Sequence, residues 1–227
     1  MKNLILKSVL VLCVSSTLYA GGGGDIFRSN LTIDQLEYQL NDEKSTAWDA
    51  YGFMGFDTHK IYLYSDGEKE KGSSASSEND LVYSRAFAAY WDIQAGISYD
   101  KNSQRSNTWA QIALSGLAPY FFETRVAILA DKDGNVGIRS DFAYDVLLTQ
   151  KLIITPSLQM DAYTKDNVES GIGSGLSNVT IGARMRYEFR REFAPYLGVE
   201  WSKNYGKTND ISPLNQTYLA LGLSMWF

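Results

Sequence analysis

Residues 178–201 carry the clearest pattern in this chain, an alternation of apolar and polar side chains. Between residues 179 and 189 the odd positions are apolar or aromatic, whereas Arg184, Arg186 and Glu188 lie on even positions. A period of two predicts a β-strand whose two sets of side chains point to opposite faces. The charged face could not lie in a dry core without extensive ion pairing. The pattern therefore favours a wall between lipid and water.

The same alternation recurs along the rest of the chain and predicts about twelve strands of roughly nine to eleven residues, the length that crosses a bilayer at a tilt. The expected strands are residues 31–40, 48–56, 60–68, 81–88, 91–100, 109–115, 122–128, 138–148, 154–163, 179–190, 196–202 and 217–227. Long polar loops are expected at residues 67–79, 101–107, 165–175 and 204–215. Short turns alternate with these loops, which predicts an all-β fold, a transmembrane antiparallel outer-membrane β-barrel with both termini in the periplasm.

A soluble β-sandwich or a lipocalin-like barrel is the competing fold. It gives the same period of two, but its apolar face would form the core and its charged face would meet solvent. Aromatic residues near predicted strand ends, such as Tyr99, Tyr187 and Trp201, favour the membrane barrel. The unequal loop lengths and the C-terminal Phe227, which lies on the apolar face, point the same way.

The N-terminus predicts export from the cytoplasm. Positive Lys2 and Lys7 precede a short apolar run, so residues 1–20 are interpreted as a signal peptide. Residues 21–30 are expected to be a flexible Gly-rich lead, and residues 31–227 the barrel. Cys13 lies in the signal, so the mature chain would contain no cysteine, which excludes disulfides, thiol nucleophiles and cysteine-bound metals. The net charge of -5 argues against nucleic acid as a partner.

The barrel interior is the best candidate for a functional site. Its predicted lining is Glu37, Asp49, Lys60, Arg85, Asp92, Glu123, Arg125, Arg139, Asp141, Asp145, Asp161, Arg184, Arg186, Glu188 and Glu200. These side chains could form a salt-bridge network that fills a narrow barrel, or an ion path in which carboxylates attract a cation. Outside this set, Asp57 and His59 are weak candidates for metal ligands and are better explained as solvated turn residues.

Several long segments resemble the copper resistance protein B family of bacterial outer-membrane proteins. The resemblance runs from about residue 31 to residue 227 and is carried by WDAYGFMGFDTHKIYLYSDGE, YSRAFAAYWDIQAGISYD, LSGLAPYFFE, YDVLLTQKLIITP, GIGSGLS and RYEFRREFAPYLGVEW. It implies a barrel in the cell outer membrane, in contact with its lipid, that takes part in copper resistance or homeostasis, binds copper ions and acts beside periplasmic copper-handling proteins. Family members often carry a Met- and His-rich N-terminal segment, whereas here the barrel is expected directly after the signal peptide. Met54, Met160, Met185 and Met225 are all expected on the lipid face.

Three functions are therefore compared. The first is a barrel that binds or passes copper between the exterior and the periplasm. The second is a barrel plugged by its own side chains that serves as a structural or docking element. The third, a membrane enzyme such as a lipid hydrolase, needs an exposed Ser–His pair. Because His59 lies at a predicted turn and is the only histidine, we expect no enzymatic activity.

Overall fold

The computed structural model describes residues 26–41, 44–70, 72, 74–102 and 105–227. The expected signal peptide, residues 1–20, lies outside the described residues, as do residues 21–25 of the expected lead. The first strand begins at Arg28, so Arg28, Ser29 and Asn30 belong to the sheet.

The described chain forms one antiparallel sheet. Its strands are β1 (Arg28–Leu40), β2 (Thr46–Gly55), β3 (His59–Lys69), β4 (Ser76–Ala88), β5 (Trp91–Lys101), β6 (Ser106–Ala118), β7 (Phe122–Asp131), β8 (Val136–Ala143), β9 (Val146–Leu147), β10 (Leu152–Tyr163), β11 (Gly175–Tyr187), β12 (Phe193–Asn204) and β13 (Asn215–Trp226). Strands β8 and β9 both pair with β10 and occupy one position in the wall. Consecutive strands pair throughout, and β13 pairs with β1, so the twelve-stranded barrel is closed, as predicted.

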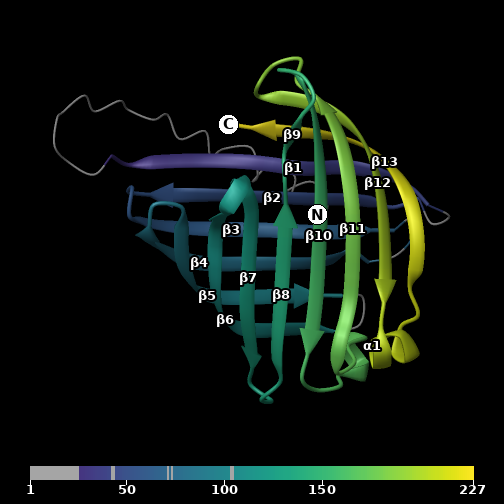
Figure 1. The fold of residues 1–227 in the computed structure, drawn as a ribbon. Coiled ribbons are helices and arrows are strands. Elements are labelled where there is room, and N and C mark those ends of the chain that lie inside the picture. The colour runs from purple at the N-terminus through teal and green to yellow at the C-terminus, as the bar shows by residue number, and fades with distance from the viewer. Residues whose placement is uncertain (1–25, 42–43, 71, 73, 103–104) are drawn as a thin grey trace, which may run out of the picture.

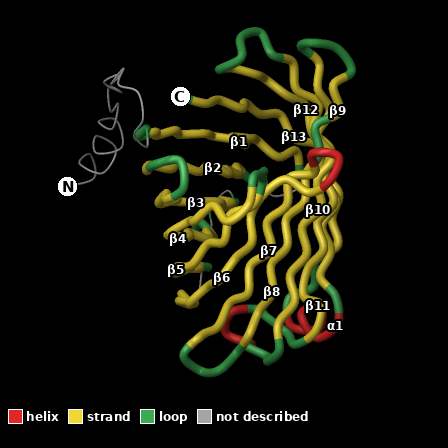
Figure 2. The backbone as a smooth tube through the Cα atoms, turned by 60° about the vertical axis from the view of Figure 1, so that its left-hand side comes forward, coloured by secondary structure: helices red, strands yellow, loops and turns green. Residues whose placement is uncertain are grey.

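The two walls of the barrel cross each other in projection. In Figure 1, β1 to β6 run across the back, whereas β7, β8, β10 and β11 run upright in front. Strands of a closed barrel tilt against its axis, so opposite walls must cross in this way. Figure 2 shows the same walls after rotation, with helix α1 (Gly206–Ile211) gathered among the loops at one end.

Side-chain exposure distinguishes this barrel from a soluble one. Large apolar residues point outward and are exposed, for example Leu63 at 55% and Leu219 at 59%. Small polar residues on the opposite parity are buried inside, such as Ser98 at 0% and Gln94 at 1%. A soluble sandwich or lipocalin-like barrel would show the reverse arrangement. An apolar exterior around a polar interior is the pattern of a barrel that stands in lipid.

No helix among the described residues has both the length and the apolar character needed to cross a membrane.

The connections differ in length between the two ends of the barrel. One end, called the short-turn end, carries the turns at residues 56–58, 89–90, 119–121, 148–151 and 188–192, together with the two ends of the described chain. The other end, the long-loop end, carries the two longest connections, residues 164–174 and 205–214. This asymmetry agrees with the predicted alternation of short and long connections.

Two features of the long-loop end differ from the sequence-based expectation. The expected loop at residues 67–79 is largely strand, because Gly67 pairs with Ser77 and Glu68 pairs with Ser76. Backbone groups gain hydrogen bonds from such pairing whatever the side chains are, so the polar composition concealed the strand ends. Helix α1 lies within the expected loop at residues 204–215 and was not predicted.

The two longest loops are joined to each other. The Gly173 amide donates to the Thr208 hydroxyl of α1 over 2.9 Å, and Thr208 is 3% exposed. On the surface, Lys207 Nζ lies 2.9 Å from Asp166 Oδ2. Hydrogen bonds from Lys207 and from the Ser174 amide lower the pKa of Asp166 to about 2.

Glycines on the inner wall make room for large side chains. A Cβ atom at Gly222 would lie 2.4 Å from the Cζ atom of Tyr196, and the Tyr196 hydroxyl donates a 2.9 Å hydrogen bond to buried Glu37. The absence of a side chain at position 222 therefore allows the Tyr196 ring to lie against the wall.

We expect Gly222→Ala to lower the free energy of unfolding by about 1–3 kcal/mol, because the methyl group displaces a packed ring. The temperature at which the folded barrel loses its fast-migrating band in SDS gels would measure the change. Gly52→Ala is the matched control, since a Cβ there would meet its nearest atom at an ordinary 3.4 Å. Equal stability of both variants would contradict the packing argument.

Candidate functional site: the charged lumen

Most of the charged residues expected in the lumen point into it. They are Glu37, Asp49, Lys60, Asp92, Glu123, Arg125, Arg139, Asp141, Asp161, Arg184, Arg186 and Glu200, which lie on the inward parity of their strands. Asp145 lies between β8 and β9 and Glu188 directly follows β11, and each contacts the inward Arg186. Arg85 was wrongly expected there. In β4 the inward positions are those of buried Asp80, Val82 and Ser84, so Arg85 falls on the exposed outward parity. It lies near the end of its strand, where an outward charge is tolerated because it can reach the membrane surface.

Several inward carboxylates were missed by the sequence analysis. They are Asp34, Asp66, Glu68, Glu78, Asp80 and Asp100. Glu78 was placed in a loop that proves to be strand. Asp34 lies at a bulge between Ile33 and Gln35, which shifts the parity of β1. Asp66 shares its parity with Lys60 in an expected strand, so the alternation alone could have identified it.

The first ion-pair network braces the wall formed by β11, β12, β13 and β1. Arg184 lies 3.2 Å from Glu37 and 2.7 Å from Glu200. Tyr196 donates to Glu37, and the Tyr218 hydroxyl donates to Glu200. The Glu37 side chain is only 1% exposed, so its charge depends on these partners.

A second network joins strands that are not neighbours in the sheet. Arg139 of β8 lies 2.5 Å from Asp100 of β5 and 2.8 Å from Glu78 of β4. Its Nε also donates to the Tyr163 hydroxyl over 3.3 Å. Because β8 is separated from β5 by two strands, this guanidinium spans part of the lumen.

Arg125 of β7 forms a third network beside an aromatic surface. It lies 2.6 Å from Asp80 and stands 4.5 Å above the ring of Tyr64. The Tyr64 ring stacks on Tyr62 at 5.5 Å, and Lys60 lies 5.6 Å from the ring of Phe53. Cations are attracted to aromatic faces, so Lys60 and Arg125 are held against the β2–β3 wall.

The fourth network lies near the short-turn end, where the wall is interrupted. Pro156 of β10 cannot donate a ladder hydrogen bond, and its carbonyl instead accepts the Tyr144 amide over 3.1 Å between β8 and β9. At this break Asp145 accepts hydrogen bonds from Thr155 at 2.6 Å and from Arg186 at 2.5 Å. Arg186 also lies 3.9 Å from Glu188.

Four inward carboxylates occupy paired positions on adjacent strands. Asp49 of β2 is the register partner of Asp66 of β3, Asp66 pairs with Glu78 of β4, and Glu78 pairs with Asp100 of β5. We call this set the carboxylate row. Arg139 forms ion pairs with both Glu78 and Asp100, whereas Asp49 and Asp66 form no ion pair within the described part of the chain. Like charges on directly opposed residues repel, so a cation nearby would be attracted.

Other inward acids add to the negative charge. Asp141 and Asp161, on the wall formed by β8 and β10, likewise have no ion pair among the described residues. The inward cations of the described strands are Arg28 at the short-turn end of β1, Lys60, Arg125, Arg139, Arg184 and Arg186, and the inward carboxylates outnumber them. Asp66 and Gln159 point inward yet are exposed, so the lumen surface is accessible to water. The ion-pair networks therefore do not fill the lumen completely.

The weak metal-ligand candidates lie outside the lumen. Asp57 pairs with Arg28 over 3.2 Å at the short-turn end, and His59 contacts the Tyr83 hydroxyl on the outer wall. Within the described residues, no group of three or more His, Cys, Asp or Glu side chains is arranged to hold a metal ion. Met54 and Met185 are 48% and 42% exposed on the outer wall, and Met160 and Met225 share the outward parity. The donors inside the described lumen are thus oxygen and nitrogen groups.

These features define an outer-membrane β-barrel, closed, apolar outside and charged inside. Two solved structures share the fold. The KdgM porin matches with a TM-score of 0.54 and 15% identity, and the match covers 87% of this chain and 99% of that chain. The NanC porin matches with a TM-score of 0.56 and 11% identity, and the match again covers 87% of this chain and 99% of that chain. Outer-membrane barrels keep short turns in the periplasm and longer loops outside, so we assign the short-turn end to the periplasm.

The chain belongs to the copper resistance protein B family. The family model described as copper resistance protein B precursor (CopB) matches residues 27–227. Copper resistance protein B of Escherichia coli is 37% identical over 201 residues, which are 86% of this chain and 68% of the relative. A copper resistance protein B homolog of Pseudomonas syringae pv. tomato (strain ATCC BAA-871 / DC3000) is 35% identical over 205 residues, 88% of this chain and 70% of that relative. Both the family and the fold place the chain in the outer membrane.

Arg184→Met should lower the free energy of unfolding by about 3–5 kcal/mol, because it leaves Glu37 buried without its cation. Arg186→Met is the matched comparison. Its partner Asp145 is 37% exposed, so we expect a loss within about 1 kcal/mol. Adding Glu37→Gln to Arg184→Met should recover part of the stability. Denaturant unfolding in lipid vesicles would measure all three variants, and equal losses for Arg184→Met and Arg186→Met would refute the assignment.

Proposed function

We propose that the lumen passes copper ions, as hydrated Cu(II), between the exterior and the periplasm. The observation that carries the proposal is the pair Asp49 and Asp66, a half-buried and an exposed carboxylate on adjacent strands with no ion pair among the described residues. In a narrow pore, unneutralised carboxylates raise the local concentration of cations and repel anions.

The arginines do not cancel this attraction. Arg125, Arg139, Arg184 and Arg186 each contact at least one carboxylate, so their charge is already balanced along the wall. The remaining inward acids, among them Asp49 and Asp66, set the potential that a passing ion experiences. A cation that enters the lumen therefore meets unpaired carboxylates, while the arginines of the wall are already paired with other carboxylates.

The donor chemistry supports the divalent form of copper. Carboxylate, hydroxyl and amide groups line the described lumen, whereas Met54 and Met185 point toward lipid. Thioether and thiolate ligands select Cu(I), while oxygen donors suit harder, hydrated ions. Weak contacts from several oxygen groups also favour passage, since an ion that binds too tightly cannot leave.

A plugged barrel is the second candidate, and the ion-pair networks favour it. Arg139 spans β8 to β5, and Arg184 ties β11 to β1 and β12, so these side chains narrow the lumen. In that case the barrel would serve as a structural or docking element for periplasmic copper-handling proteins.

The family and the porin-like fold also fit a protein that is not an enzyme.

Ion flux into liposomes separates the two candidates. Vesicles carrying the purified barrel and an entrapped copper-sensitive dye should take up Cu(II) faster than vesicles without protein. No uptake above that background, with a barrel that is shown to be folded, would favour the plug.

The variant Asp49→Asn, Asp66→Asn should reduce Cu(II) uptake at least about fivefold, the effect of roughly 1 kcal/mol of lost attraction between a carboxylate and a cation in water. Asp57→Asn is the matched control, because it removes an aspartate outside the lumen. The proposal fails if the double variant conducts like the parent, or if Asp57→Asn reduces uptake to the same extent.

A further inference from the structure

The side chains of His59, Tyr83 and Arg85 gather on the outer wall near the periplasmic end. His59 begins β3 and is the register partner of Arg85 in β4, so the two residues lie directly opposite each other. His59 Nδ1 contacts the Tyr83 hydroxyl, and the two rings stack with centroids 5.9 Å apart. All three are exposed, and neither the lumen nor the ion-pair networks use them.

The outer wall changes character at this cluster. On β4 the outward residue Leu81 is apolar, and Tyr83 and Arg85 follow it toward the periplasm. On β3 the outward residues Leu63 and Ile61 are apolar, and His59 follows them. Aromatic and cationic side chains replace aliphatic ones where a barrel leaves the hydrocarbon layer. The cluster therefore lies at the level of the lipid headgroups.

The guanidinium of Arg85 has no side-chain partner among the described residues of the outer wall. It forms no side-chain hydrogen bond or ion pair within the part of the chain that the structure describes, although Asp57 lies in the adjacent turn and pairs with Arg28 over 3.2 Å. An outward cation near the membrane boundary extends toward the surface, where it finds an anionic group. The guanidinium offers several donors in a planar fork, which matches the oxygens of a phosphate.

The His59–Tyr83 contact orients a second donor toward the same place. If the Tyr83 hydroxyl donates to Nδ1, the neutral imidazole carries its proton on Nε2. The cluster then presents a guanidinium and an imidazole N–H on neighbouring strands. Two donors side by side can hold two oxygens of one phosphate diester.

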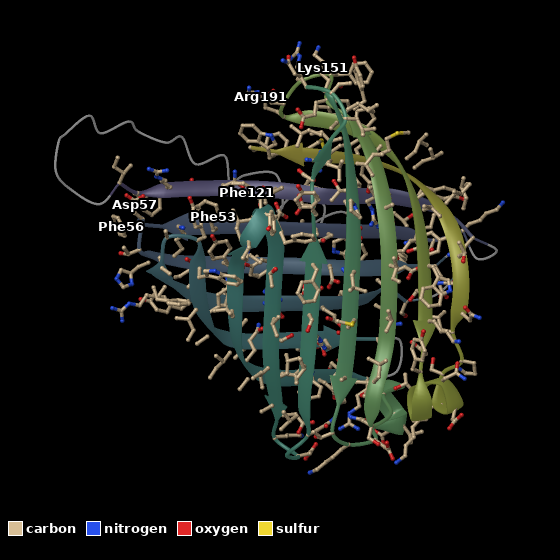
Figure 3. All side chains as sticks on the ribbon, in the orientation of Figure 1. Phe53, Phe56, Asp57, Phe121, Lys151 and Arg191 are labelled. Carbon is tan, nitrogen blue, oxygen red and sulfur yellow. The ribbon has the colours of Figure 1, made fainter. Side chains whose placement is uncertain are left out.

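Exposed cations also occur elsewhere on the periplasmic rim. Lys151, Arg190 and Arg191 lie in the β9–β10 and β11–β12 turns. Figure 3 shows Lys151 and Arg191 at the top of the view and Phe56 and Asp57 of the β2–β3 turn at its left, so these cations belong to another part of the rim than the cluster. Basic clusters at a membrane surface attract anionic lipid, whereas a neutral headgroup gains little from them.

We propose that His59, Tyr83 and Arg85 form a binding site for the phosphate of an anionic glycerophospholipid in the periplasmic leaflet. The guanidinium of Arg85 neutralises the phosphate, and His59 Nε2 donates to a second oxygen. The outward aliphatic residues of β3 and β4 pack against the acyl chains. The site would fix the depth and rotation of the barrel at the β3–β4 hairpin.

Native mass spectrometry of the purified barrel tests the site. With added phosphatidylglycerol, the parent should retain at least one lipid, and Arg85→Gln should retain it about fivefold less, the change expected for one arginine at a membrane surface. Lys60→Gln is the matched control, because it removes a cation one residue from His59 that points into the lumen. It should retain the lipid like the parent.

Two further arms identify the ligand. His59→Gln should weaken retention less than Arg85→Gln, because it removes a neutral donor and not a charge. Millimolar inorganic phosphate should leave the retained lipid in place, since the acyl chains contribute to binding. Full displacement by phosphate would overturn the lipid assignment in favour of a free-phosphate site. The lipid assignment would also be overturned if Arg85→Gln retained as much lipid as the parent, or if Lys60→Gln lost as much lipid as Arg85→Gln. A protein partner would then be the better explanation of the cluster.

Discussion

The structure depends on the hydrogen bonds that join its last strand to its first. Within hydrocarbon no water can satisfy a free backbone group, so a sheet is stable there only when it has no edge. The Phe227 amide donates to Leu31 over 2.8 Å, and the Leu31 amide donates to Phe227 over 3.1 Å. This closure forces one face of every strand toward lipid and the other toward a single enclosed lumen. The separation of apolar from charged residues is its direct consequence.

Enclosure also explains why the interior is built from ion pairs. A charged residue that points inward cannot leave the lumen, and its neighbours on the wall are equally confined. Arg184 and Arg139 each contact carboxylates from two other strands, so each arginine joins parts of the wall that are distant in sequence. Such contacts narrow the lumen and stabilise its shape, while the acids left over keep it negative. The paired residues therefore brace the wall, and the unpaired acids account for the excess of negative charge inside it.

Much of the fold could be predicted from the sequence, because alternation reports directly which face a residue occupies. The twelve strands followed from alternation and from the polar turns between the alternating segments, and the outward methionines followed from parity. The assignment of residues to a face was wrong where a bulge shifted the alternation, or where the charge or polarity of a residue was given more weight than its position in the alternation. Arg85 was assigned to the lumen because it is charged, although its parity matched that of Leu81 and Tyr83. The bulge beside Asp34 shifts parity without a sequence signal, and the polar residues 67–79 concealed strand ends above the membrane.

Pairing between particular side chains could not be predicted in this way. Nothing in the alternation shows that Arg139 reaches Asp100 rather than its register partner Asp161, because that choice depends on barrel radius and on the space left by Tyr163. The relation of β4 to β3, which brings Arg85 opposite His59, likewise required the register. Sequence reasoning therefore gave the faces of the wall, and the structure was needed for the contacts across it.

The carboxylate row has a consequence that follows from strand tilt. Register partners lie along a line perpendicular to the strands, and this line is inclined to the axis of a barrel whose strands tilt by about 40°. With strands about 4.8 Å apart, each step to the next strand moves about 3 Å along the axis. Asp49, Asp66, Glu78 and Asp100 therefore climb the wall as a spiral ramp and do not form a ring. An ion on this ramp would turn about the axis as it advanced, with a carboxylate always within reach of its hydration shell.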